Sequence, residues 1–304
     1  MKQTARLFAC IMLCAVVSLF PGCSIQYDDL RLSNDEQLGE RLSQYIDNDT
    51  QVTNLIDKSM PAELPMYRIH KRVITDKEYD DILMVLGISK PLSAKQWVNR
   101  KDNRLHIQLI DVITATRAFF GMSPEELESN ARDVFSKLSV MEGTYEYVGQ
   151  RASYKRIDNQ GEHILAAGAG FCPIIDGIRV VGNGTCWFYY DGEGIVELIV
   201  ELYDYEEIGT MKLIPLQDAI ERITDPDRFS IESEGDASSI GVISSLQVNR
   251  IELRYVNQFY LGKEFLIPVY CFRGIAEDKD GAQSDFLSIV NASPLTGVKL
   301  THVG

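Results

Sequence analysis

The sequence predicts an α+β protein made of two α/β lobes, in which antiparallel sheets pack against a few helices. The chain has 304 residues, of which 45% are apolar and 24% charged, a composition typical of globular proteins and a length sufficient for two domains. Helical and strand patterns alternate over residues 61–143, whereas strand patterns dominate residues 144–304. We therefore expect an N-terminal α/β lobe and a β-rich C-terminal lobe with these boundaries.

The first 22 residues have the pattern of an export signal. Lys2 and Arg6 precede an apolar stretch over residues 7–20, which is shorter than the roughly 20 residues of a membrane-spanning helix. The stretch ends at Gly22-Cys23, which resembles the lipobox of bacterial lipoproteins. This resemblance implies that Cys23 receives acyl chains, such as palmitate, and holds the protein on the extracytoplasmic face of the cell membrane. An ordinary cleaved signal and an uncleaved anchor are the alternatives.

The charge balance excludes one class of partner. The chain carries 30 Lys and Arg residues against 44 Asp and Glu residues, a net charge of −14. A surface this acidic repels phosphate backbones, so we expect no nucleic-acid partner.

The segments before and within the first lobe carry clear helix signals. Residues 23–60 are predicted to form a polar, partly helical tether that includes a Ser33/Glu36 capping box. A strand is expected over residues 67–74 and a helix after Thr75, with Glu78 completing the box and Gly87 ending the helix. The other elements expected in this lobe are a strand over residues 105–109 and a helix opened by Ser123-Pro124-Glu125-Glu126.

Strand patterns fill most of the second lobe and predict an antiparallel meander. A turn over residues 158–161 joins two of its strands into a hairpin, Pro215 begins a helix, and residues 230–245 are expected to be a loop without elements. Pro268 lacks a backbone donor, so its strand is expected at an edge or bulged. The predicted strands cover residues 145–154, 163–171, 178–181, 186–190, 195–203, 248–256, 265–273 and 286–290.

Three cysteines remain if the signal is removed and Cys23 is acylated. Cys172 and Cys186 lie in successive strand-like segments and could form a disulfide if their Cα atoms lie within about 7 Å of each other. Cys271 would then stay unpaired. Three buried, reduced cysteines are the interpretation that we favour.

No complete catalytic or metal-binding motif is present, so we expect a protein that is not an enzyme and needs no metal or other cofactor. No two of the four histidines are closer than 36 residues, and His106 and His163 are expected on strand faces with their polar tips in water. Two acid pairs, Glu206-Glu207 and Asp225/Asp227, are close only in sequence. A solvated strand end and a helix stop explain them better than acid–base chemistry.

A run of four aromatic residues, Trp187 to Tyr190, marks one strand of the second lobe. Alternation along a strand places Trp187 and Tyr189 on one face and Phe188 and Tyr190 on the other. A strand buried between the sheet and helices is the favoured interpretation, and an exposed binding patch is the alternative.

The second lobe resembles PepSY-like domains and the related YycH/YycI-type extracytoplasmic regulators of sensor kinases. The resemblance covers roughly residues 144–297, more faintly residues 66–142, and rests on residues 177–181, 187–196, 214–220, 251–255, 265–270 and 290–292. It implies a PepSY-like second half and a non-catalytic module that binds a protein at the membrane surface, either a sensor kinase or a peptidase. Such a module could accept a partner strand at an open sheet edge.

The side chains considered for contact with the partner are Trp187, Tyr189, Pro268 and Tyr270. Two other functions stay open at this point. One is an extracytoplasmic hydrolase with a site of scattered acidic residues, and the other is a structural envelope lipoprotein.

Overall fold

The computed structural model describes residues 46–56, 59–89, 92, 96–109, 120–158, 161–224, 228–232, 241–260 and 263–293. The signal, Cys23 and most of the predicted tether lie outside these residues. The three helices of the described residues are α3 (Asp76–Val85), α4 (Pro124–Phe135) and α5 (Leu216–Glu221). The strands are β1 (Ile46–Asn54), β2 (Glu63–Lys71), β3 (Trp97–Lys101), β4 (Arg104–Gln108), β5 (Thr144–Asp158), β6 (Gly161–Ile175), β7 (Ile178–Val181), β8 (Cys186–Tyr190), β9 (Ile195–Glu201), β10 (Tyr203–Lys212), β11 (Arg228–Glu232), β12 (Ile243–Tyr260), β13 (Lys263–Asp278) and β14 (Gln283–Asn291).

These strands form one continuous mixed sheet, so the expected α+β arrangement of two separate α/β lobes is wrong. The sheet has 14 strands, with the order β10-β2-β13-β12-β7-β6-β8-β9-β4-β3 along its main path. The remaining strands pair beside this path: β1 with β12, β14 with β13, β11 with β14, and β5 with β6. The protein is mostly β because its hairpins extend into long two-stranded ribbons. The short strand β7 pairs with β6 on one side and β12 on the other, and so joins two of these ribbons.

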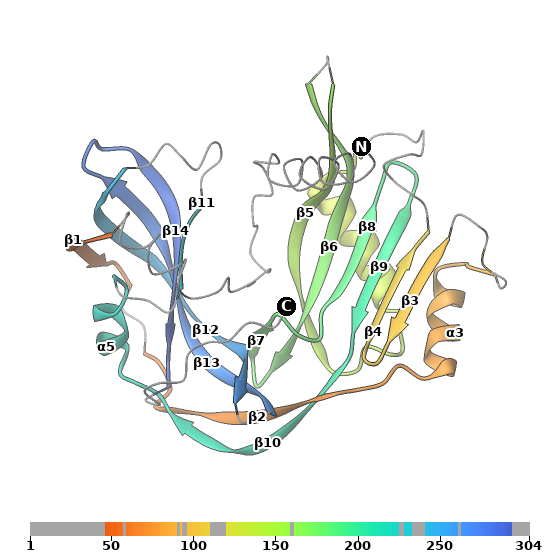
Figure 1. Ribbon diagram of the computed structural model, residues 1–304, viewed down its shortest axis with the longest axis horizontal. Coiled ribbons are helices and arrows are strands. Elements are labelled where there is room, and N and C mark those ends of the chain that lie inside the picture. Colours follow the sequence, from red (N-terminus) through yellow and green to blue (C-terminus); the bar gives the residue numbers. More distant parts are fainter. Residues whose placement is uncertain are drawn as a thin grey trace, which may run out of the picture.

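Figure 1 shows two groups of strands at a wide angle, with β2 and β10 running along the lower border between them. One group, here called the helix-backed half, contains β3, β4, β5, β6, β8 and β9 together with α3 and α4. The other group, here called the strand-rich half, contains β1 and β11 to β14 together with α5. β1 is parallel to β12, so the end of the predicted tether is a strand of the sheet.

The two longer helices begin where the sequence predicts. The side chains of Thr75 and Ser123 accept hydrogen bonds from the backbone N–H groups of Glu78 and Glu126, and both capping boxes are complete. These bonds satisfy backbone donors that have no partner inside a helix. After α3 the chain turns at Gly87, whose φ of 68° favours glycine.

The main apolar core lies between the sheet and helices α3 and α4 of the helix-backed half. Fully buried residues from both helices, such as Ile82 and Leu127, pack against strand residues that include Leu105, Phe171 and Phe188. Phe171 also stacks on Phe135 of α4, with ring centroids 4.1 Å apart. The strand-rich half has a second core, in which α5 covers buried residues of β12 to β14.

Pro268 lies inside the sheet and in regular register with β12, so the predicted edge or bulge at this residue is wrong. Its strand β13 pairs with β12 on one side, opposite Tyr255. On the other side β2 pairs as far as Leu266 and β14 begins at Val269, so Pro268 lies at the change of partner. Its carbonyl oxygen accepts a hydrogen bond from the Ala292 N–H. A residue without an N–H is tolerated there because Pro268 only has to accept a hydrogen bond on that side, and the regular pairing with β14 begins at Val269.

The second half also differs from the prediction around residues 230–245. Strand β11 covers the start of this segment and pairs with β14, and β12 begins before its end. Residues 233–240, between these two strands, lie outside the described residues. The predicted hairpin and the strands over residues 178–181 and 186–190 are confirmed.

Candidate binding surface

Four arginine side chains come together on one face of the sheet where β7, β12 and β13 lie side by side. Arg250 and Arg254 point to the same face of β12 because side chains alternate along a strand. Arg273 of β13 lies opposite Arg250, and Arg179 of β7 lies opposite Arg254. This group, with Glu252 between the two arginines of β12, is called the arginine face below.

Ion pairs connect the side chains of the arginine face. Glu252 accepts hydrogen bonds from Nε and Nη2 of Arg254, at 3.0 and 2.8 Å, and also pairs with Arg250. Arg179 donates from Nε to Glu146 of β5 at 2.8 Å. Burial alone would raise the pKa of Glu252, but Arg254, Arg250 and Arg179 outweigh it and lower this pKa. Glu252 is therefore held as a carboxylate among three positive groups.

The arginine side chains of this face differ in how much of their surface is exposed to solvent. The side chain of Arg250 is 59% exposed, that of Arg179 is 16% exposed, and that of Arg254 is 4% exposed. A guanidinium group keeps its charge in proteins. The face thus gathers four guanidinium groups in a chain whose net charge is −14.

Cys271 lies on this same face, opposite Glu252. Burial raises the pKa of its thiol, and the neighbouring Arg254 and Arg273 oppose that rise. Cys172, Cys186 and Cys271 are all free and buried, which confirms the favoured interpretation. Cys186 pairs with Phe171 across the strands, so Cys172, the next residue of β6, points to the opposite face of the sheet.

The four side chains considered for partner contact are all buried. Strand β8 is paired on both sides, and the ring of Trp187 packs directly over Gly170, where a Cβ atom would come within 2.6 Å of it. Tyr189 belongs to the same small apolar cluster. Tyr270 lies in the core beneath α5 and donates its hydroxyl to the Ile214 carbonyl at 2.9 Å. Pro268 lies at the change of strand partner described above, so these residues hold the sheet together.

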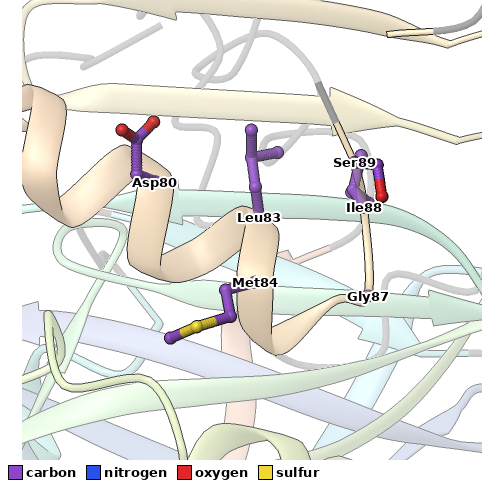
Figure 2. Close-up of a pocket in the computed structure, with 6 residues that line it drawn as sticks. All are labelled: Asp80, Leu83, Met84, Gly87, Ile88 and Ser89. Atoms are coloured by element: carbon purple, nitrogen blue, oxygen red, sulfur yellow. The ribbon is translucent and has the colours of Figure 1, made fainter. Parts of the chain in front are cut away.

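Two shallow hollows lie near the helices. Figure 2 shows the first, of about 350 Å³, beside the end of α3, lined by Asp80, Leu83, Met84, Gly87, Ile88 and Ser89. The second, of about 450 Å³, lies between α4 and the turn at Gly192. The one carboxylate in each, Asp80 or Glu126, meets no second titratable group of the lining. Among the described residues no group of three or more His, Cys, Asp or Glu side chains could hold a metal ion.

The acid pairs do not form a site in the described residues. Glu206 is exposed on β10 and pairs with His70 at 3.0 Å and Arg68 at 3.4 Å. The hydrogen bond from His70 lowers the pKa of Glu206. Asp225 and Asp227 lie outside the described residues.

His106 has a buried acidic partner that the sequence pattern did not reveal. Its Nε2 lies 2.7 Å from Oε1 of Glu197, a buried residue of the neighbouring β9. The ring of Trp97 meets the His106 ring edge-on, with centroids 4.9 Å apart. The expected polar tip in water is wrong for His106, because β4 and β9 bring residues 91 positions apart together.

Comparisons with known proteins give a distant likeness to a solved structure. No protein-family model matches the sequence, and no curated protein matches it either. The expected membership of the PepSY family is therefore not supported by a family model. Among solved structures the chain is similar to YycH from Bacillus subtilis, with 12% sequence identity and a TM-score of 0.39. The match covers 79% of this chain and 52% of that one, so the chain spans about half the length of that protein. A likeness at this level carries no argument about function.

The described helices also bear on membrane attachment. None of them is long and apolar enough to cross a membrane.

Proposed function

We propose that the protein is a non-catalytic regulatory lipoprotein, anchored through Cys23 on the extracytoplasmic face of the cell membrane, that modulates a membrane sensor kinase or a peptidase by direct contact. The arginine face is the observation that carries the contact. We propose that it receives an acidic segment of the partner. The anchor rests on the sequence pattern of residues 1–23 alone.

The spacing of the arginines favours an extended acidic segment over a compact anion. Arg250 and the pair formed by Arg254 and Arg179 are four residues apart along the strand, which is about 13 Å because a strand advances about 3.3 Å per residue. Glu252 already occupies the space between Arg250 and Arg254 and pairs with both, so its carboxylate would repel a single compact anion placed there. Carboxylates at separate positions of an extended chain can approach Arg250 and Arg179 on either side of it, and guanidinium groups bind carboxylates in bidentate geometry.

The exposure gradient assigns different roles to the arginines. Arg250 is the first group that an incoming carboxylate meets because its side chain is 59% exposed. Arg254 lies behind it, held by Glu252, and adds positive potential at the face. Arginine is also among the residue types that contribute most to protein interfaces.

In-cell crosslinking of the full-length chain tests this proposal. The protein is captured after crosslinking and its partners are identified by mass spectrometry, in parallel with Cys23→Ala and Arg250→Gln. We expect one sensor kinase or peptidase with the unsubstituted chain, loss of it with Cys23→Ala, and a loss of about tenfold with Arg250→Gln, which corresponds to about 1.4 kcal/mol of binding free energy for a charge pair that forms with the partner.

Arg132→Gln in α4 is the matched control. Its side chain is 53% exposed and pairs with Glu128 at 2.7 Å, so it resembles Arg250 in exposure and partner but lies on another part of the molecule. Equal recovery of the partner with Arg132→Gln and Arg250→Gln would reject the arginine face as the contact. Unchanged recovery with Cys23→Ala would reject the anchor, and recovery of envelope background alone would reject the regulatory function.

A further inference from the structure

Strand β3 is the end of the sheet on the helix-backed side. In the described part of the chain it is paired with β4 alone. Four of its five residues are exposed, and the side chain of Trp97 is exposed although it is large and apolar, at 47% of its surface. An edge of this kind offers a free row of backbone N–H and C=O groups to another strand.

The sequence of β3 is complementary to itself. In an antiparallel pair centred on Asn99, Trp97 of one copy stands opposite Lys101 of the other, Val98 opposite Arg100, and Asn99 opposite Asn99. We propose that two copies of this chain associate through β3 in this register, with a two-fold axis at Asn99. The proposal goes beyond the contact at the arginine face and does not depend on it, but it rests on the proposed membrane anchor for the concentration of the two copies.

The side chains on the face away from the helices fit this register. Trp97, Asn99 and Lys101 share that face because strand side chains alternate. The Lys101 ammonium of each copy lies over the Trp97 ring of the other, a cation–π contact at both ends of the pair. Two carboxamides at the axis hydrogen-bond to each other, and an isologous contact of this kind closes as a dimer.

On the helix side of β3, Arg100 is the remaining positive group, and a partner within its own chain matches its charge. Arg100 of β3 donates to Asp76 of α3 at 2.6 Å and lies over the ring of Tyr79, 5.6 Å from its centroid. Its charge is therefore matched within its own chain, and Val98 stands opposite its aliphatic part. The positive groups of the two copies lie at opposite ends of the pair, so they do not face each other.

Strand β10, at the other end of the main sheet path, is less suited to pairing with another strand. β10 is also terminal, but a bulge between Glu207 and Gly209 interrupts it. It also carries three carboxylates within four residues, Asp204, Glu206 and Glu207. Charges and bulges are common means by which proteins keep edge strands from pairing. β3 has no bulge, and its two charged residues, Arg100 and Lys101, lie at one end of the strand.

A standard protein–protein interface buries about 800 Å² per partner. Five residues per copy bury much less surface, so the dimer is expected to be weak in dilute solution. Confinement of both copies to one membrane would raise their effective concentration.

Cysteine crosslinking of the full-length chain in membranes tests the register. Asn99 faces its own copy across the axis, so Asn99→Cys is expected to form a disulfide-linked dimer on mild oxidation, because paired residues have Cα atoms about 4.5 to 5.5 Å apart. Trp97→Cys is the matched control. Its two copies would lie about 13 Å apart along the strands and cannot join. The unsubstituted chain measures the background from the native cysteines.

The expected result is at least about tenfold more crosslinked dimer with Asn99→Cys than with Trp97→Cys, and crosslinking restored when Trp97→Cys and Lys101→Cys chains are co-expressed. Adding Lys101→Glu to Asn99→Cys should lower the yield several-fold, because it removes both cation–π contacts. Equal yields from Asn99→Cys, Trp97→Cys and the unsubstituted chain would overturn the proposal. Circular dichroism confirms that each variant is folded, and a partner strand on β3 would appear as a crosslink to another protein, which also overturns it.

Discussion

The two halves of the sheet bury their inner surfaces by different means. The helix-backed half covers one face with α3 and α4 and fills the space with apolar side chains, among them Phe171 and Leu127. The strand-rich half covers one face with α5 but places the arginine face on the other, where ion pairs to Glu252 and Glu146 accompany a smaller apolar cluster. Apolar packing stabilises without direction, whereas a buried charge is tolerated only where a partner group is held in register. The first half is therefore held by packing without direction, and the second also depends on ion pairs in a fixed register.

The largest effect is expected from a cavity in the helix-backed half. Phe171→Ala removes a ring that stacks on Phe135 and meets Phe188 edge-on, so the free energy of unfolding should fall by about 3 to 5 kcal/mol. Denaturant unfolding measures it. The exposed Val73→Ala should change the same quantity by less than about 0.5 kcal/mol. A loss from Phe171→Ala no larger than this would mean that α4 does not seal the core.

In the strand-rich half, Glu252→Gln should lower the free energy of unfolding by about 2 to 3 kcal/mol, because it leaves the buried Arg254 without its carboxylate. The double substitution Glu252→Gln/Arg254→Met sharpens the comparison. An apolar side chain of similar length in place of the charge should recover most of that loss, as measured by the same unfolding experiment. If the double variant is less stable than Glu252→Gln, packing and not charge dominates this face.

A cap is expected to have a smaller effect than either core. Ser123→Ala removes the acceptor for the Glu126 N–H at the start of α4, and the free energy of unfolding should fall by about 1 kcal/mol. Ser123→Asp, which keeps an acceptor at that position, is the control and should cost little. A loss above about 2 kcal/mol would show that the start of α4 also positions the core.

The smallest effect at neutral pH concerns Asp278, at the end of β13. Its carboxylate accepts hydrogen bonds from the N–H groups of Gly241 and Ala282, in that order of effect, and these lower its pKa. A lowered pKa in the folded state means that this stabilisation is complete above the unfolded pKa of 3.8 and is lost as pH falls through the lower folded value. Asp278→Asn should therefore flatten the loss of stability below about pH 4, as urea unfolding at several pH values would show. An unchanged acid slope would assign that loss to other carboxylates.

Local signals predicted the elements of both halves well. The capping boxes at Thr75 and Ser123 and the hairpin in which Asp158 pairs with Gly161 depend on neighbouring residues, and the structure confirms them. The burial of Trp187 and Tyr189 also follows the favoured interpretation of their strand. By contrast, the sequence pattern does not predict strands β3 and β10. Both lie at ends of the sheet path, and exposed edge strands have little of the apolar alternation that marks a strand in a sequence.

The candidate site could not be predicted because its parts are distant in sequence. Arg179 and Arg254 are 75 positions apart in the printed chain, and each by itself is an ordinary polar residue of a strand. Their meeting depends on the parallel pairing of β7 with β12, and a shift of that register by one residue would send Arg179 to the other face. The same reason hides the contact between His106 and Glu197.

The sequence by itself determined local conformations, such as where the helices begin at Thr75 and Ser123. Those features depend on interactions within a few residues, which chain order makes visible. Only the tertiary structure decided that the strands join in one sheet, that Pro268 lies inside it, and that four arginines share a face. Strand pairing joins residues far apart in sequence, and many pairings satisfy the same alternation of side chains until all strands are placed together.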